Sequence, residues 1–367
     1  MAQPISKFMF FTDLHLFDGP SYPFFAWPTD SEMGERRVTR TAPERLQKCL
    51  DDCVANDIDL LVFGGDWLDS SNGDALDESG DDRHQIMQDS FDFMKAHDFM
   101  SVHNGKIIMI RGNHDFGEDQ GDTYGTFADW DTQISYLGAD HLSRTSPHVV
   151  DSVEVGFVVD THNVRFICCH HNNTVTYDES AFYTWLGDRA SETDLPIILM
   201  QHVTGGEGSS TPASSTFTQA FQDVLLANDN VQLILAGHDH RGKYPVLSQN
   251  WYENMNHNEV IAKKVLDSTL RAKDIFIFMG QGGLRPLNNV NSAAPWSTTS
   301  NPSDPSDISD EDFANNAGAD NSAHYIISIK PFAFKGVGTR RMADLKIEGF
   351  DQGTIMNKDW EKKLYLK

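Results

Sequence analysis

Metal-binding side chains recur along much of the chain, each just after a short apolar run. Asp13 and His15 follow the first run with one residue between them, and Asp66 follows the second run after two glycines. Because alternate residues of an extended segment point the same way, Asp13 and His15 can both reach one ion. One such pair is common by chance, so it gains meaning only as part of a longer series.

Three further clusters continue this series after three further apolar runs. They are Gly112-Asn113-His114-Asp115, Gln201-His202 and Gly237-His238-Asp239-His240. The candidate ligands are two carboxylates, one amide carbonyl and four imidazoles: Asp13, Asp66, Asn113, His15, His202, His238 and His240. This mixture suits Mn, Fe, Zn, Ni or Co better than Ca, and it is larger than one ion needs. Five clusters in order are hard to reach by accident and predict a metal site.

Short buried strands are expected before these clusters. The apolar runs are Phe8 to Phe11, Leu60 to Phe63, Ile107 to Ile110, Ile197 to Met200 and Leu233 to Ala236. Continuous apolar runs of this length are typical of strands buried on both faces. The candidate ligands therefore fall in loops at strand ends, where an α/β scaffold gathers functional residues.

Helical patterns alternate with these strands. One begins at Thr41, a candidate N-cap, and runs through Pro43 to Val54 with apolar residues on one face. Further helices are predicted at Gln85 to His97, Glu179 to Arg189, Phe217 to Ala227 and Glu259 to Ala272, with strands near Val164 to Cys169, Ile275 to Met279 and Tyr325 to Ile329. The alternation favours an α/β fold with mixed sheets.

Three segments interrupt the alternation and are predicted to be long loops: residues 18–40, 69–82 and 288–322. The last is rich in Ser, Asn, Asp and Pro, so we expect it to be mobile because it cannot bury enough apolar surface to order itself. The expected division is a catalytic domain at 1–287, a polar flexible loop at 288–323, and C-terminal strands and tail at 324–367 that complete the same domain.

A known family carries the same series of motifs. The sequence resembles the calcineurin-like metallophosphoesterase superfamily in Asp13-x-His15, Gly65-Asp66-x-x-Asp69, Gly112-Asn113-His114-Asp115, His202 and Gly237-His238-x-His240. The resemblance implies a four-layer αββα sandwich with two mixed β-sheets and a dinuclear metal centre at the strand ends. It also implies the ligands of each ion: Asp13, His15 and His240 for the first metal, Asn113, His202 and His238 for the second, and Asp66 as the bridge.

The resemblance implies two residues that act beside the metals. His114 is next to the ligand Asn113 and resembles the general acid of the family, and Asp69 resembles the acid that orients that histidine. Asp69 could instead be a solvated loop acid. His170 and His171 follow a predicted strand, where they either flank the site or have a structural role.

A dinuclear centre of this kind is suited to hydrolysis of phosphate esters. Two divalent ions roughly 3.5 to 4 Å apart lower the pKa of a bridging water, orient the phosphoryl oxygens and stabilise in-line displacement. The bridging hydroxide is then the nucleophile. Two Asp ligands supply a charge of about −2 against about +4 from the ions, so the site attracts an anionic substrate.

Differences from the motifs of related phosphatase families narrow the class of reaction that the sequence favours. Asp69 stands where purple acid phosphatases have Tyr, so a tyrosinate-bound ferric ion is not expected. Ser70, Ser71 and Asp115 stand where protein Ser/Thr phosphatases have Arg, Gly and Glu. The general phosphoesterase and phosphodiesterase branch fits better, and we expect a small phosphodiester as substrate.

The charge of the chain bears on its partners. The formal net charge of −25 disfavours broad attraction to nucleic acid or to an anionic membrane. From Lys330 to the end, however, nine bases face five acids, including Lys335, Arg340, Arg341 and Lys346. This basic segment supports the alternative of a DNA nuclease of the same fold. An alternative of another class is a non-catalytic interaction scaffold that retains the metal site.

Cysteine content and hydropathy bear on the cellular compartment in which the protein is expected. The chain has four cysteines, and Cys49 and Cys53 are one helical turn apart on an apolar helix face, so we expect them in the core and chemically inert. A disulfide framework is not expected. Asp13 interrupts the first apolar run before a signal-peptide core forms, and no apolar run reaches about 18 residues. The expectation is a cytoplasmic protein with no membrane partner.

Overall fold

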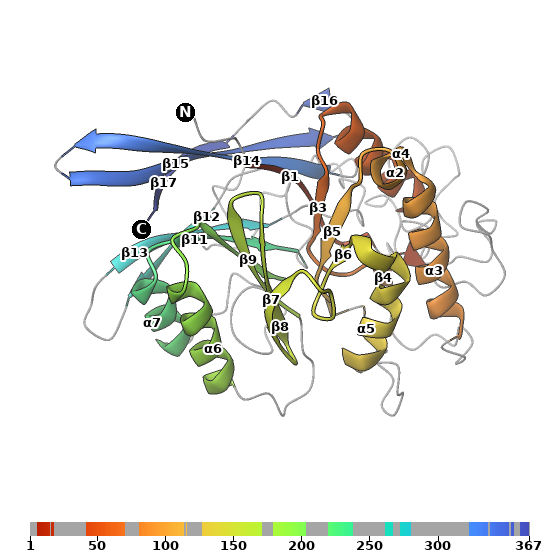
Figure 1. Cartoon of the computed structure of the whole chain (residues 1–367), viewed down its shortest axis with the longest axis horizontal. Helices are drawn as coiled ribbons and strands as arrows, with labels where there is room; N and C mark the ends of the chain where they lie inside the picture. Colours follow the sequence, from red (N-terminus) through yellow and green to blue (C-terminus); the bar gives the residue numbers. More distant parts are fainter. Residues whose placement is uncertain are drawn as a thin grey trace, which may run out of the picture.

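The computed structural model is an αββα sandwich in which two β-sheets face each other and helices cover both outer faces (Figure 1). This confirms the expected fold class. The structure describes residues 6–14, 16–17, 42–69, 81–113, 115, 127–170, 179–202, 219–237, 261–266, 272–279, 323–336, 338–351, 354–355 and 360–366. Among these residues, none of the helices is long and apolar enough to cross a membrane.

The first sheet has the strand order β16-β15-β14-β1-β3-β5-β6, with β17 paired to β15. Its parallel strands are β1 (Ser6–Phe11), β3 (Leu60–Phe63), β5 (Lys106–Met109) and β6 (His141–Leu142). Its antiparallel strands are β14 (Ala323–Gly336), β15 (Gly338–Asp351), β16 (Thr354–Ile355) and β17 (Trp360–Leu366). The outer face carries α2 (Ala42–Ala55), α3 (Asp81–Ala96), α4 (Asp98–Ser101), α5 (Phe127–Ile134) and the 3-10 helix η3 (Ser135–Asp140).

The second sheet has the order β12-β13-β11-β10-β9-β8-β7. Its strands are β7 (Val149–Val153), β8 (Gly156–Thr161), β9 (Val164–Cys169), β10 (Ile197–Gln201), β11 (Val231–Ala236), β12 (Ile261–Leu266) and β13 (Ala272–Met279). The run from β9 through β10 and β11 to β13 is parallel. The helices α6 (Glu179–Ser191) and α7 (Gln219–Ala227) pack on its outer face.

Burial on both faces explains why the central strands are continuous apolar runs. In β1, Phe8 and Phe10 lie in the core between the sheets, whereas Met9 and Phe11 lie in the core beneath the helices. The ring of Phe8 meets that of Phe166 from the opposite sheet edge to face, with centroids 5.2 Å apart. Such a pair adds to the apolar burial that holds the two sheets together.

Cys49 and Cys53 lie fully buried in the core beneath the helices, as predicted, and both are free thiols. Burial, followed by contact with Cys53, raises the pKa of the Cys49 thiol well above its ordinary value. A thiol that stays protonated is a poor nucleophile and a poor metal ligand. This agrees with the expected inert role.

The helix predicted at Glu259 to Ala272 is wrong. The described part of that range forms the strand β12, which pairs antiparallel with β13 from Ile261↔Ile277 to Leu266↔Ala272. Apolar residues in this segment fit a helical period, but β-branched residues and the chance to extend the second sheet outweigh it. The predicted loops at 18–40, 69–82 and 288–322 lie outside the described residues, apart from Asp69 in the short strand β4 (Leu68–Asp69) and the first residues of α3.

The C-terminal strands join the N-terminal part of the chain. β14 pairs with β1 from Ser6↔Ile329 to Phe10↔Tyr325. His324, which is fully buried, contacts Asp52 of α2 with 2.6 Å between Nε2 and Oδ2. Strands from both ends of the chain therefore share one sheet, while the division at residues 287 and 323 stays a prediction.

Candidate metal centre

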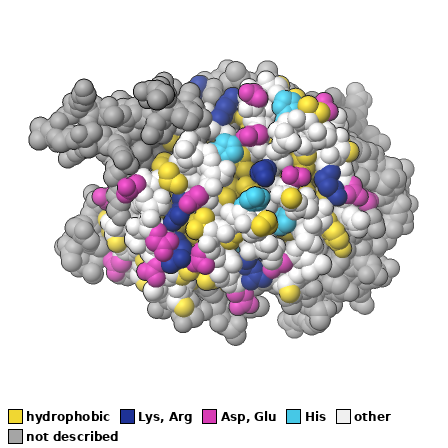
Figure 2. Space-filling model, in the orientation of Figure 1, with side chains coloured by type: hydrophobic (Ala, Val, Ile, Leu, Met, Phe, Trp, Pro, Cys, Tyr) yellow, Lys and Arg dark blue, Asp and Glu magenta, His cyan; other side chains and the backbone are white. Residues whose placement is uncertain are grey.

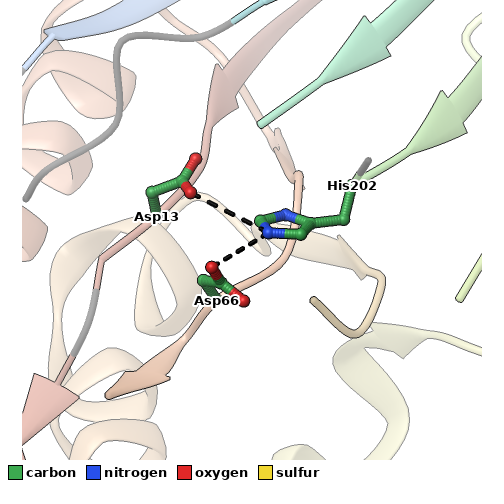
Figure 3. Close-up of side chains that lie close together, drawn as sticks. All are labelled: Asp13, Asp66 and His202. Atoms are coloured by element: carbon green, nitrogen blue, oxygen red, sulfur yellow. Dashed lines mark ion pairs between the residues drawn. The ribbon is translucent and has the colours of Figure 1, made fainter. Parts of the chain in front are cut away.

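Four of the predicted ligands come together at one edge of the sandwich. Asp13 follows β1, Asp66 follows β3 and Asn113 comes shortly after β5, whereas His202 follows β10 of the second sheet. Parallel neighbours end at the same edge of a sheet, so these loops are brought close together. Figure 3 shows the side chains of Asp13, Asp66 and His202 pointing toward one another, and one ligand atom from each lies within 4.8 Å of the others.

His202 is the centre of this group. Its Nε2 lies 2.9 Å from Oδ2 of Asp66, 3.1 Å from Oδ1 of Asn113 and 4.0 Å from Oδ1 of Asp13. Asp13 and Asp66 are fully buried and His202 is 1% exposed. Two carboxylates removed from water are costly unless a positive charge lies beside them. The arrangement therefore favours a positive charge between these side chains.

The other ring nitrogen of His202 fixes the tautomer. Nδ1 lies 2.8 Å from the carbonyl oxygen of Gly64, which can only accept a hydrogen bond, so Nδ1 carries the proton. Histidines that bind metals are commonly oriented in this way by a backbone carbonyl. Nε2 is thereby directed toward the oxygens of Asp66, Asn113 and Asp13.

Electrostatics at His202 show how strongly the site attracts positive charge. Burial by itself lowers the pKa of His202, but Asp66 and then Asp13 outweigh it and raise the pKa to about 9. The oxygens that hold a proton on Nε2 are also suitable donors to a divalent ion. A proton and a metal ion therefore compete for the same place.

Asp13 and Asp66 both have an uncommon backbone conformation. Asp13 has φ 54° and Asp66 has φ 57°, in the left-handed region. Aspartate is one of the few residues other than glycine that adopt this region, because its short polar side chain can hydrogen-bond locally. Two hydrogen bonds hold the loops in this form, from Asp13 N to Gly65 O and from Gly64 N to Phe11 O, each 2.9 Å long.

Two glycines leave room for the ligand atoms. A Cβ added at Gly112 would overlap Oδ1 of Asp66, and one added at Gly237 would lie 2.5 Å from Oδ2 of Asp13. Side chains at these positions would fill the space in which the carboxylates converge. Buried oxygens, an oriented imidazole and this cleared space together fit divalent transition-metal ions.

Two polar residues at the centre were not among the predicted ligands. Thr12 donates a hydrogen bond from Oγ1 to Oδ2 of Asp13 at 2.6 Å. The carboxylate of Asp115 accepts backbone N–H groups from the loops that carry Asp66 and Asn113. Both stand next to ligands in the sequence, but their residue types do not distinguish them from ordinary loop residues.

His170 has a structural position. Its Nδ1 accepts the backbone N–H of Arg111 at 3.0 Å, and its ring packs 5.4 Å from Phe157 and 6.4 Å from Trp130. Burial, and then the charge of Arg111, lowers its pKa well below the ordinary value, so the ring is neutral. His170 thus joins the end of β9 to the loop before Asn113. His171 lies outside the described residues.

The remaining predicted site residues are not described in full. His15, His114, His238 and His240 lie outside the described residues. Asp69 is described through its backbone, as the last residue of β4 (Leu68–Asp69), which pairs in parallel with β2 (Leu16–Phe17). The backbone bond from Gly237 N to His202 O, 3.1 Å long, brings the end of β11 beside His202. The roles of these residues stay predictions.

Comparison with known proteins identifies a family and solved structures that the chain resembles. The family model described as calcineurin-like phosphoesterase matches residues 6–242. No curated protein matches the sequence. The crystal structure of a dimetal phosphatase from Danio rerio has a TM-score of 0.49 and 11% sequence identity, and the comparison covers 98% of this chain and 99% of that chain.

Proposed function

Since the chain belongs to the calcineurin-like phosphoesterase family and is thereby a hydrolase of phosphate esters, we propose that it acts through two divalent transition-metal ions on small phosphodiesters. The observation that carries the proposal is the convergence of Asp13, Asp66 and His202, whose ligand atoms lie within 4.8 Å of one another. Their oxygen and nitrogen donors suit Mn, Fe, Zn, Ni or Co.

The proposed ligand assignment extends from this group to its neighbours in sequence. Asp66 would be shared by the two ions, and its proximity to His202 supports that role. Asp13, His15 and His240 would hold one ion, and Asn113, His202 and His238 would hold the other. When bound, such ions lower the pKa of water and stabilise charge that develops on phosphoryl oxygens.

The residues of the chain have separate tasks in this proposal. Asp13 and Asp66 supply the buried negative charge that retains cations, and the Gly64 carbonyl keeps His202 in the ligating tautomer. His114 gives a proton to the leaving-group oxygen, and Asp69 orients His114. The pairing of β4 with β2 holds the backbone of Asp69 beside the segment that follows His15, a proposed metal ligand.

Hydrolysis of model esters tests the proposal. We expect the purified protein with Mn²⁺ to release nitrophenol from bis-nitrophenyl phosphate faster than from nitrophenyl phosphate. EDTA should abolish both reactions and added Mn²⁺ should restore them. A preference for monoesters across nucleotide monoesters, nucleotide diesters and cyclic nucleotides would contradict the diester assignment. No turnover with any of several divalent metals would favour a non-catalytic scaffold.

A DNA nuclease is the second candidate, and the formal net charge of −25 argues against it. On the face shown in Figure 2, acidic and basic side chains of the described residues are interspersed. A phosphate backbone is usually tracked by a continuous basic surface. DNA cleavage that is lost in Arg340→Glu/Arg341→Glu while small-ester turnover remains would establish the nuclease instead.

A further inference from the structure

We propose that Asp115 is a positioning residue that locks the loops carrying Asp66 and Asn113 into the geometry that binds metal. The inference rests on the proposed function, since it concerns the same centre. Asp115 is 9% exposed, and both oxygens of its carboxylate face backbone N–H groups. It ligates no ion in the proposed assignment.

Four N–H groups converge on this one side chain. Oδ2 accepts from Gly112 N at 2.7 Å and from Asp66 N at 2.9 Å. Oδ1 accepts from Trp67 N at 2.8 Å and from Leu68 N at 3.0 Å. An ionised carboxylate offers about four lone-pair sites and no donor, so it satisfies all four groups at once. Hydrogen bonds to a charged acceptor are also stronger than neutral ones.

These contacts join two separate loops. Asp66, Trp67 and Leu68 follow β3, whereas Gly112 and Asp115 follow β5. Oδ2 holds Asp66 N and Gly112 N together, and Gly112 is the position where a Cβ would overlap the Asp66 carboxylate. The distance between the bridging ligand and the Asn113 loop is therefore set through one oxygen atom of Asp115.

The four hydrogen bonds to the Asp115 carboxylate, here called the clamp, also hold Asp66 in its left-handed conformation. Asp66 has φ 57°, and Asp115 accepts its N–H and those of the next two residues, which holds the backbone of the loop in this form. Trp67 extends the clamp into the core: its Nε1 donates to Ser90 Oγ at 3.0 Å, and its ring packs 4.8 Å from Phe63. The ligand loop is thus tied to α3 and β3 as one unit.

A neutral replacement cannot reproduce the clamp. Asp115→Asn keeps the size of the side chain, but one oxygen becomes an NH₂ group that faces two N–H donors. Replacement of partners outside the ligand shell typically weakens metal binding about 10- to 100-fold. We expect that loss for Mn²⁺, with much of the turnover recovered when Mn²⁺ is raised to saturation, because all the ligands remain.

The experiment is a titration of metal-free protein with Mn²⁺, followed by the electron paramagnetic resonance signal of the free ion. Wild type, Asp115→Asn and Asp66→Asn are compared. Asp160→Asn is the matched control, because Asp160 in β8 also accepts two hydrogen bonds, from Arg165 at 2.7 and 2.6 Å. Arg165 lies near the start of β9, at the opposite end of that strand from His170. This control should bind Mn²⁺ like the wild type.

The outcomes distinguish failure of the positioning role of Asp115 from failure of the proposed metal centre. Wild-type affinity in Asp115→Asn, with metal lost in Asp66→Asn, would overturn the positioning role and leave the proposed function intact. Wild-type metal binding in Asp66→Asn would overturn the centre itself. If near-ultraviolet circular dichroism shows that Asp115→Asn does not fold, Asp115→Glu decides, because its extra methylene displaces both oxygens. Wild-type affinity in that folded variant would equally overturn the proposal.

Discussion

His202 and Asp66 meet across the two sheets, with 2.9 Å between Nε2 and Oδ2, although one follows β10 and the other β3. Neither sheet alone can form the centre, because each contributes one side of this contact. Packing between the sheets therefore determines the distance between ligands.

Asp66→Asn should lose metal and activity together. Asp66 is buried beside His202 and Asp13, so loss of its charge removes the largest attraction for a cation at His202. Metal content can be measured by elemental analysis after dialysis against Mn²⁺. The matched control is Asp52→Asn, which removes the charge from a carboxylate–histidine contact with His324 outside the centre and should retain both ions. Full metal content in Asp66→Asn would exclude a bridging role.

The metal-free protein should lose stability as the pH rises from about 6.5 to about 9. The pKa of His202 is raised from 6.5 to about 9, so its protonated form stabilises the fold fully below 6.5 and this contribution is lost as the pH passes about 9. A shift of this size corresponds to at most about 3 kcal/mol. Urea unfolding at several pH values measures it.

The control for the pH effect is His202→Gln, whose stability should not show this decrease. The same competition predicts that Mn²⁺ binding releases a proton below pH 9. Calorimetric titration in buffers of different ionisation enthalpy counts that proton. Equal stability of the wild type at pH 6.5 and 9.5 would contradict the assignment of the titration to His202.

His114→Ala should keep both metals and lose turnover. Protonation of a leaving group typically contributes about 10² to 10⁴ in rate. The loss should appear with a poor leaving group such as an alkyl alcohol and nearly vanish with nitrophenol, which departs without a proton. Turnover number and metal content are measured on the same preparation. An alkyl ester hydrolysed at the wild-type rate would rule out His114 as the acid.

Gly112→Ala should weaken metal binding without unfolding the protein. The added Cβ would overlap both Oδ1 and the backbone N of Asp66, so both the carboxylate and the loop that carries it must move from their positions beside His202. Gly187→Ala, in the middle of α6, is the matched control. The added Cβ would contact only Val224, at an ordinary distance of 3.8 Å. Alanine in a helix is favoured over glycine by roughly 0.5 to 1 kcal/mol, so this control should be slightly more stable. Equal Mn²⁺ affinity in both variants would contradict the steric argument.

The strands that position the ligands were predictable because they are buried on both faces. Such strands are continuous apolar runs, and the polar clusters after them fall at the strand ends in the structure, as Asp13 does after β1. The strand β12 was not predictable, since its apolar residues also fit a helical period. Pairing with β13, which only the folded sheet supplies, decides between the two.

The convergence of Asp13, Asp66, Asn113 and His202 was predictable from the sequence, whereas the residues that support it were not. Metal ligands are chemically distinctive and occur in a known order. Asp115 acts through backbone N–H groups, which every residue except proline possesses, so no residue type marks its partners. The left-handed conformations of Asp13 and Asp66 likewise depend on contacts between loops that are distant in sequence.

The pairing of β14 with β1 has a consequence for synthesis of the chain. β1 (Ser6–Phe11) is made long before its partner on one side, β14 (Ala323–Gly336). Until β14 arrives, β1 presents an unpaired edge with apolar residues on both faces, which is a template for aggregation. Release from the ribosome before residue 323 would therefore leave an aggregation-prone edge immediately before Asp13. Chaperone demand should be highest for these incomplete chains.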